Sequence, residues 1–342
     1  MDLSQGIEKL ADKLPHAAQY WLSKPFHVFT TAEERVFIPY ILTTLLVAII
    51  ALGITQRKTI RQALKEIFNP KILKHPDTLN DLQYFYVNNI LFWLVLIPMT
   101  AGILQACAAF SEGLVVVFGW KGALGHSTPL ILGVFTVTMV IINDFGVYLT
   151  HRLQHALPFL WEFHKTHHSA EVLTPMTEYR IHPIDFLLGF VISFTLVGLF
   201  DGLCRGLFIE HLAEWKVLGV NVIQMAYYAT FFNLRHSHIW VDFGPLNKLI
   251  ISPAQHQIHH SDNPKHFDKN FGQLFGFWDW LFGTMYSPSQ RETIAFGLGD
   301  PQEQQNFKSL AGLYLSPFIG VWQKWGFASR RKTASGKRIE PV

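Results

Sequence analysis

The chain has 342 residues, of which 49% are hydrophobic and only 15% are charged, and its formal net charge is +3. This composition is typical of a membrane protein. No basic patch interleaved with aromatic residues is present, so a nucleic-acid partner is not expected. The two cysteines, Cys107 and Cys204, lie in or beside apolar segments and lack a CxxC partner, which argues against a disulfide framework or a zinc ribbon. We expect two buried free thiols.

Residues 1–35 are predicted to form an N-terminal lead. Ile7, Leu10, Leu14 and Ala17 recur at helical spacing, which favours an amphipathic helix lying on the membrane surface. No basic segment is followed by an apolar core at the start of the chain, so we expect no cleavable signal peptide. The first spanning helix would then direct the chain to the membrane.

Long apolar segments predict the rest of the fold. Residues 36–54 carry no charge and approach the roughly 20 residues that cross a bilayer. Further spans are predicted at residues 87–110, 130–150, 184–200 and 217–232, of which the last two form a re-entrant pair if they prove too short. The expected fold is therefore an all-α integral membrane protein with about four to five transmembrane helices. Its predicted parts are the lead, residues 36–129 with the first two spans, a catalytic region at 130–287 and a C-terminal tail at 288–342.

The distribution of cations predicts the orientation. Six of them lie within 20 residues after the first span: Arg57, Lys58, Arg61, Lys65, Lys71 and Lys74. The positive-inside rule places this connection in the cytoplasm, and it places the poorly charged residues 119–128 on the far side. The third span then returns the chain to the cytoplasm just before His151. The tail, which contains Arg330, Arg331 and Lys332, is expected to be cytoplasmic and solvated, with attraction to anionic lipid as a secondary role.

Eight histidines between residues 151 and 260 fall into three clusters. The clusters are His151-Arg-Leu-Gln-His155, His164-Lys-Thr-His167-His168 and His256-Gln-Ile-His259-His260. On a helix, residues three or four apart project from one face, so these rings can converge on a metal. Imidazole is a common neutral ligand for zinc, copper, iron and nickel. Eight gathered imidazoles without a metal would repel one another on protonation, and they exceed what one metal can use, so two metals are predicted.

Several short motifs accompany the clusters between residues 144 and 284. They are Asn233-Leu-Arg-His236-Ser, Gly244-Pro-Leu, Asn270-Phe-Gly, Trp278-Asp279 and Phe282-Gly283-Thr284. Together with the histidines they resemble the fatty acid hydroxylase and sterol desaturase superfamily of membrane di-iron oxygenases. The resemblance implies a di-iron centre held by the eight clustered histidines and His236, with His182 as a tenth candidate at a position that the family often fills with His or Gln. His238 stands where relatives usually carry Asn, and we place it outside the site.

Carboxylates are expected to orient the imidazoles by accepting their second N–H. Asp144 lies seven residues before His151, two turns along the same helical face and inside an otherwise uncharged span. Charges at such a depth are usually functional or paired. Asp279 is the second residue predicted for this role, and Glu162, Glu178 and Asp185 are further candidates.

The resemblance implies two iron ions, with zinc able to replace them in a preparation, and O2 as co-substrate. The expected activity is hydroxylation of a fatty-acyl, sterol or alkylglycerol-type lipid, with desaturation or ether cleavage as alternatives that use the same oxidant. A membrane zinc hydrolase is a weaker hypothesis, because Arg, Leu and Gln separate His151 from His155 where zincins carry His-Glu-x-x-His. No haem motif or nucleotide-binding glycine loop is present, so a separate electron donor is expected, either of the cytochrome b5 type or a ferredoxin with its reductase. The predicted location is the bacterial inner membrane or the endoplasmic reticulum, with the site on the cytoplasmic side.

Overall fold

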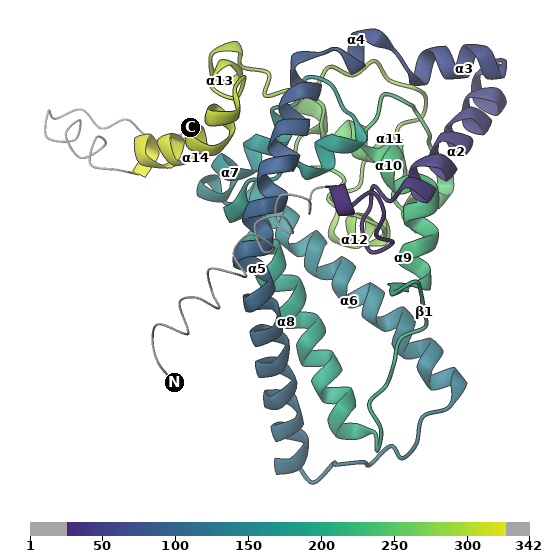
Figure 1. The fold of residues 1–342 in the computed structure, drawn as a ribbon, viewed down its shortest axis with the longest axis vertical. Helices are drawn as coiled ribbons and strands as arrows, with labels where there is room; N and C mark the ends of the chain where they lie inside the picture. The colour runs from purple at the N-terminus through teal and green to yellow at the C-terminus, as the bar shows by residue number, and fades with distance from the viewer. Residues whose placement is uncertain (1–25, 326–342) are drawn as a thin grey trace, which may run out of the picture. The chain divides into compact units, whose positions relative to one another are not determined.

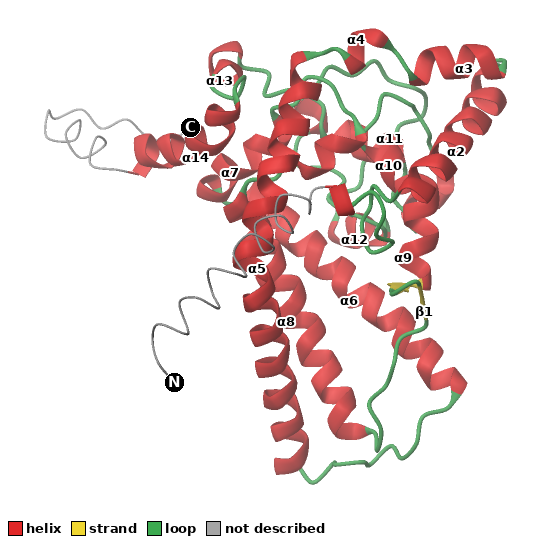
Figure 2. Cartoon of the chain, in the orientation of Figure 1, coloured by secondary structure: helices red, strands yellow, loops and turns green. Residues whose placement is uncertain are grey.

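A computed structural model describes residues 26–325, and this part of the chain is mainly helical (Figures 1 and 2). The first elements are α2 (Ile38–Gln56), α3 (Ile60–Ile67), α4 (Pro70–Leu73), α5 (Pro76–Val117), α6 (Pro129–Ala156), α7 (Pro158–His168), η1 (Pro175–Tyr179) and α8 (Pro183–Leu207). A hairpin of β1 (Lys216–Val217) and β2 (Val220–Asn221) follows, and then α9 (Val222–Tyr227), the π-helical η2 (Tyr228–Phe232), α10 (Asn233–Arg235), η3 (Gly244–Lys248), α11 (Pro253–His259), η4 (Pro264–His266), α12 (Phe277–Phe282), α13 (Pro301–Gln305) and α14 (Leu310–Trp325). The predicted surface helix near Ile7 and the tail cations lie outside the described residues.

Prolines start the helices that carry most of the clustered histidines. Pro129, Pro158 and Pro253 are the first residues of α6, α7 and α11. Proline suits this position because its fixed φ is helical and the first N–H of a helix has no partner within the helix. Ser252 adds a capping box to α11, since its hydroxyl accepts from the Gln255 amide while the Gln255 side chain accepts from the Ser252 amide. The sequence thus sets where each of these helices begins.

Among the residues that the structure describes, four helical segments are long and apolar enough to cross a membrane: Ile38–Gln56, Met99–Val117, Pro129–Ala156 and Pro183–Leu207. They account for the spans predicted at 36–54, 130–150 and 184–200. The span predicted at 87–110 lies within α5 and overlaps the candidate span Met99–Val117. Residues 217–232 form no span, because they are divided among the hairpin, α9 and η2, each far shorter than the roughly 20 residues that a crossing requires. The lower predicted number, four, is therefore correct for residues 26–325.

The chain divides into two compact units. Within the described residues, the first comprises residues 26–63, 82–140 and 197–233, and the second comprises residues 64–81, 141–196 and 234–325. Helices α5, α6 and α8 contribute residues to both units.

Small residues allow α5 and α8 to approach closely in the first unit. Gly198, Gly202 and Gly206 recur at every fourth position of α8. A Cβ at Gly202 would lie 2.6 Å from Cα of Ala108, and one at Gly206 would lie 2.7 Å from Cβ of Val115. Such spacing of small residues is typical of helices that pack within a membrane. Any larger side chain at these glycines would push the two helices apart.

The second unit contains a buried ionic network beside α7. The Arg180 side chain is fully buried. Its Nη1 donates to Asp81 at 2.9 Å and its Nε donates to the carbonyl of Thr166 at 3.0 Å. Because a buried charge is tolerated only when it is paired, this network fixes the end of α7 to the start of α5. The end of α7 carries His167 and His168.

Candidate metal centre

The nine clustered histidines come from four segments of the second unit. The last turns of α6 carry His151 and His155, and α7 carries the three rings at 164, 167 and 168. Only Leu157 separates α6 from Pro158, the first residue of α7. The short connection brings the two helices' rings together, with ring centroids 4.9 Å apart for His151 and His164. His236 directly follows α10, while α11 and the residue after it carry His256, His259 and His260.

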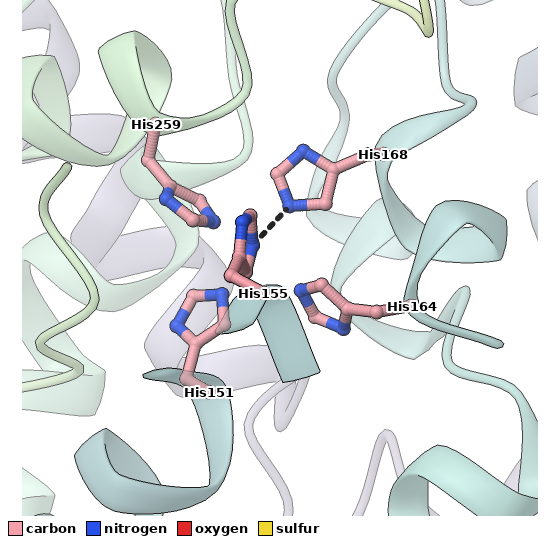
Figure 3. Close-up of side chains that lie close together, drawn as sticks. All are labelled: His151, His155, His164, His168 and His259. Carbon is pink, nitrogen blue, oxygen red and sulfur yellow. Dashed lines mark hydrogen bonds between the residues drawn. The ribbon is translucent and has the colours of Figure 1, made fainter. Parts of the chain in front are cut away.

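Five of these side chains form a first group: His151, His155, His164, His168 and His259. One ring nitrogen of each lies within 4.8 Å of those of the others. Figure 3 shows the five rings converging, with a nitrogen of each directed toward the space that they enclose. Nε2 atoms of His151, His164 and His259 are buried without a hydrogen-bond partner. Buried polar nitrogens without partners are costly, and a metal ion among them would remove that cost.

The remaining four form a second group: His167, His236, His256 and His260. Nε2 of His236 lies 3.2 Å from that of His167, 3.1 Å from that of His260 and 2.9 Å from that of His256. One Nε2 cannot satisfy three such neighbours by hydrogen bonding, since it carries one proton or one lone pair. Two nitrogens each bonded at about 2.1 Å to one ion, at a right angle, would be about 3.0 Å apart. The donor set of this group therefore also fits a metal.

Outer ring nitrogens fix the tautomers of the first group. Nδ1 of His151 lies 2.9 Å from the carbonyl oxygen of Phe271, and Nδ1 of His259 lies 2.7 Å from that of Lys269. A carbonyl only accepts, so both Nδ1 atoms carry the proton and both Nε2 atoms present a lone pair. Each of these two imidazoles is thus oriented as a metal ligand.

Buried carboxylates orient one ring in each group. Nδ1 of His164 lies 2.8 Å from Asp185, and Nδ1 of His236 lies 2.9 Å from Glu178. Both acids are themselves held, because Gln154 donates to Asp185 and Arg235 donates to Glu178. Such partners set ring orientation and strengthen a ligand. The exposed carboxylate of Asp268 is more distant from its ring, at 3.5 Å from Nδ1 of His155.

Asp144 and Asp279, the two acids predicted to orient ligands, contact no imidazole directly. Asp144 accepts from the amides of Leu274 and Phe275 at 2.8 and 3.2 Å. Asp279 accepts from the amides of Phe271 and Gly272 at 2.9 and 2.8 Å. They therefore hold the backbone of residues 271–275, whose first carbonyl accepts from His151. Their action on the site passes through the main chain.

Burial keeps the imidazoles neutral outside the membrane-spanning segments. It is the largest cause that lowers the pKa of His167, His168, His256 and His260 well below the usual value. Protonation of one ring would also be opposed by neighbouring histidines, and at His256 by Arg235, which lowers these pKa values further. Burial lowers the pKa of His259 to about 3, although its hydrogen bond to the Lys269 carbonyl acts in the opposite direction. A neutral imidazole has the lone pair that a metal requires.

His182, the tenth predicted ligand, lies outside both groups. Its Nε2 is 3.2 Å from the carbonyl oxygen of Tyr314, and its Nδ1 accepts from the amide of Ile184. Its ring packs against Phe163 and Phe318, with centroids 4.9 and 5.4 Å away. Both nitrogens are thus engaged with the main chain. The position of His182 suits a link between α7 and α14 rather than a ligand.

The sequence did not indicate the carbonyls of Phe271 and Lys269 or the carboxylate of Asp268 as partners of imidazoles. The sequence offered one relevant signal, the polar residues Asp268 and Asn270 close together in a segment rich in polar residues. Both have positive φ angles, 57° and 59°. Asp and Asn adopt this conformation more readily than other residues, so a tight bend is predictable there, although the ring that it faces is not.

The fold and the site define an integral membrane protein with paired histidine-rich groups that can hold metal ions. Residues 136–284 match the Fatty acid hydroxylase family. The chain is 26% identical to alkylglycerol monooxygenase of Homo sapiens, over 46% of this chain and 32% of that protein. It is 30% identical to ornithine lipid hydroxylase OlsE of Rhizobium tropici, over 46% of this chain and 44% of the relative. It is also 30% identical to a Delta(7)-sterol 5(6)-desaturase of Gibberella zeae, over 46% of this chain and 43% of the relative.

The match to the Fatty acid hydroxylase family thus covers less than half of the chain. The matched residues contain all nine histidines of the two groups. The chain spans less than half of the length of these curated relatives. No solved structure is significantly similar to it.

Proposed function

We propose that this protein is an O2-dependent di-iron oxidoreductase that hydroxylates a C–H bond of a membrane lipid. The observation that carries the proposal is the pair of groups in which every donor is a histidine, five in one and four in the other. Soluble di-iron carboxylate proteins use glutamates as ligands beside histidine, so this donor set belongs to a different class. The relatives named above act on lipids, which supports a lipid substrate here.

The proposed ligands of one iron are His151, His155, His164, His168 and His259, and those of the other are His167, His236, His256 and His260. His182 is left out because of its main-chain hydrogen bonds. Bound iron would supply the reductive activation of O2 that an unactivated C–H bond requires. The overall reaction converts R–H, O2, two electrons and two protons into R–OH and water. Both electrons would come from a separate donor protein.

This chain's own contribution is orientation of the ligands and exclusion of water. Asp185 and Glu178 hold one imidazole in each group. Aromatic rings cover part of the first group, since Phe271 lies 5.0 Å and Trp161 lies 4.9 Å from the ring of His155. Covered in this way, a reactive centre is protected from side reactions with water.

Desaturation is the second candidate function, and the similarity to a sterol desaturase favours it. A zinc hydrolase is disfavoured, because such an enzyme needs a carboxylate base facing its metal. Within residues 26–325, both groups contain histidine alone, and Asp185 and Glu178 contact the outer ring nitrogens. The site is proposed to face the cytoplasm, as the cations between residues 57 and 74 indicate.

Lipid mass spectrometry under 18O2 tests the proposal. Cells that express the protein should contain an alcohol-bearing lipid with one 18O atom, and the product should disappear in the variant His164→Ala. The variant His238→Asn is a matched control, because its ring lies outside both groups and contacts the carbonyl of Glu66. A product that has lost two hydrogens without gaining 18O would favour desaturation. A new oxygen derived from water would overturn the proposal and support hydrolysis.

A further inference from the structure

Helix α14 packs one face against α7 in the second unit. Leu313 is fully buried, and its carbonyl accepts from the Thr166 hydroxyl at 3.2 Å. A Cβ added at Gly320 would clash with the carboxylate of Glu162, and Lys324 forms an ion pair with that carboxylate. This face of α14 is therefore buried against α7 and is not available to another molecule.

A second face of α14 presents large apolar side chains to the exterior. Its members are between 50% and 60% exposed and are Leu315, Phe318, Ile319, Trp322 and Trp325. One part of the Phe318 ring also packs against Phe163 and His182. Their spacing of three, four, seven and ten residues from Leu315 places them along one side of a helix. We call this set the exposed stripe. Five large apolar side chains in a row are unusual on a surface that faces only water.

The composition and packing of α14 argue against a membrane crossing. Pro317 lies inside the described helix Leu310–Trp325, and Lys324 forms an ion pair with Glu162 on the face that packs against α7. A crossing requires about 20 predominantly apolar residues that face lipid. A helix that lies in the plane of the interface has one apolar face only, and tryptophan is enriched at that depth.

The sequence after α14 favours an anionic surface. Residues 326–342 contain five cations and one acid, which gives a formal charge of 5 − 1 = +4 from side chains. The cations are Arg330, Arg331, Lys332, Lys337 and Arg338. Basic clusters beside an apolar helix face are attracted to anionic headgroups. The four candidate spans among the described residues also indicate that this protein meets a bilayer.

We propose that α14 is an interfacial helix whose exposed stripe lies at the surface of an anionic bilayer, and that the cations that follow it in the sequence add electrostatic attraction to that surface. This inference does not depend on the metal content of the site. It assigns a second contact with the membrane in addition to the spanning helices. Because α14 packs on α7, it links the bilayer surface to the helix that carries His164, His167 and His168.

Spin labels on the full chain test the proposal. In a background with Cys107→Ala and Cys204→Ala, a nitroxide is attached at Leu315→Cys, Ile319→Cys or Trp322→Cys. The matched control is Asn263→Cys, which replaces an exposed polar residue of the same unit. Each protein is reconstituted into vesicles of phosphatidylcholine with phosphatidylglycerol, and collisions with O2 and with a water-soluble nickel complex are measured. Elution as a single species in size-exclusion chromatography checks that each variant is folded.

The three stripe labels should collide several-fold more with O2 than with the nickel complex, and the control should show the opposite preference. Water-like accessibility at all three positions would overturn the proposal. Protection that appears only at high protein-to-lipid ratio would also overturn it, because a second copy of the chain would then cover the stripe. Replacing Arg330, Arg331 and Lys332 by Gln should reduce the O2 preference in the anionic vesicles and leave it unchanged in pure phosphatidylcholine. Equal effects in both vesicles would refute the role of anionic headgroups.

Discussion

The two histidine groups differ in how firmly the protein holds their rings. In the five-histidine group, main-chain carbonyls accept from His151 and His259, and Asp185 contacts His164. In the four-histidine group, Glu178 contacts His236. The Nδ1 atoms of the other three members, His167, His256 and His260, are buried without a hydrogen-bond partner.

Because of this difference, the order of the imidazole rings should depend on a bound metal less in the five-histidine group than in the four-histidine group. Rings held by hydrogen bonds to fixed acceptors are already oriented before an ion binds. Rings without such acceptors gain their order mainly from the ion itself. We therefore expect the five-histidine group to be the more preorganised site and the four-histidine group to be the more easily emptied one.

The largest effect should come from removing one ligand from each group. His259→Ala leaves four rings in its group, whereas His167→Ala leaves only three in the other. Turnover should fall by at least about 100-fold in both variants, since a positioned catalytic group commonly contributes that much. Elemental analysis of folded protein should find that His167→Ala loses close to one metal per chain, the metal of the four-histidine group. His259→Ala should retain more of the metal of the five-histidine group. Equal retention would contradict the difference between the groups, and undiminished turnover in both variants would contradict the metal site.

Charge removal at the orienting carboxylates should have the next largest effect. Glu178→Gln and Asp185→Asn keep the shape of each side chain but remove its charge. Loss of such a partner typically costs 10- to 100-fold in metal affinity. We expect the larger loss from Glu178→Gln, because Glu178 orients His236, whose Nε2 lies close to all three other donors of the four-histidine group. Competition with a chelator measures both affinities, and the reverse order would count against the comparison.

Asp144→Asn should affect stability more than metal binding. The amide cannot accept as well as a carboxylate from Leu274, Phe275 and the indole of Trp278 together. The expected loss is about 1–3 kcal/mol of unfolding free energy, the usual cost of weakening buried hydrogen bonds. The thermal midpoint should fall relative to Asp262→Asn, a variant at a less buried acid of the same unit. A midpoint unchanged from that control would show that Asp144 does not hold residues 271–275.

The smallest expected effect concerns the pH dependence of stability at His238, which lies outside both groups. Burial lowers its pKa to about 4 from an ordinary value of 6.5. Its unfolded form therefore binds more protons between these values, so its contribution to stability is complete above pH 6.5 and is lost as the pH falls toward 4. By pH 5 the loss amounts to about 1–2 kcal/mol. His238→Asn should accordingly lose less thermal stability than the wild type between pH 7 and pH 5, and an identical loss in both would contradict this account.

Spacing predicted much of this arrangement because helix geometry acts over a few residues. Residues four apart, such as His151 and His155 or His164 and His168, share a face and fall into the same group. His167 and His168 are consecutive and point about 100° apart on a helix, which explains why they belong to different groups. Four of the predicted spans likewise follow from apolar length alone.

Other features depend on contacts that spacing does not encode. Residues 217–232 are apolar enough to suggest a span, but Gly219, at φ 83°, turns the chain within a hairpin. His182 resembles a ligand by position, yet its neighbour α14 is more than 100 residues away in sequence and occupies its ring. Main-chain acceptors such as the carbonyl of Lys269 cannot be predicted from residue types, since every residue has a carbonyl.

Diffraction at the iron absorption edge tests the central claim most directly. Crystals of protein purified with iron should give two anomalous peaks per chain, one among the ligands of the five-histidine group and one among those of the four-histidine group. Partial depletion with a chelator should weaken the second peak first. A single peak, or none, in fully folded and active protein would contradict the dinuclear centre.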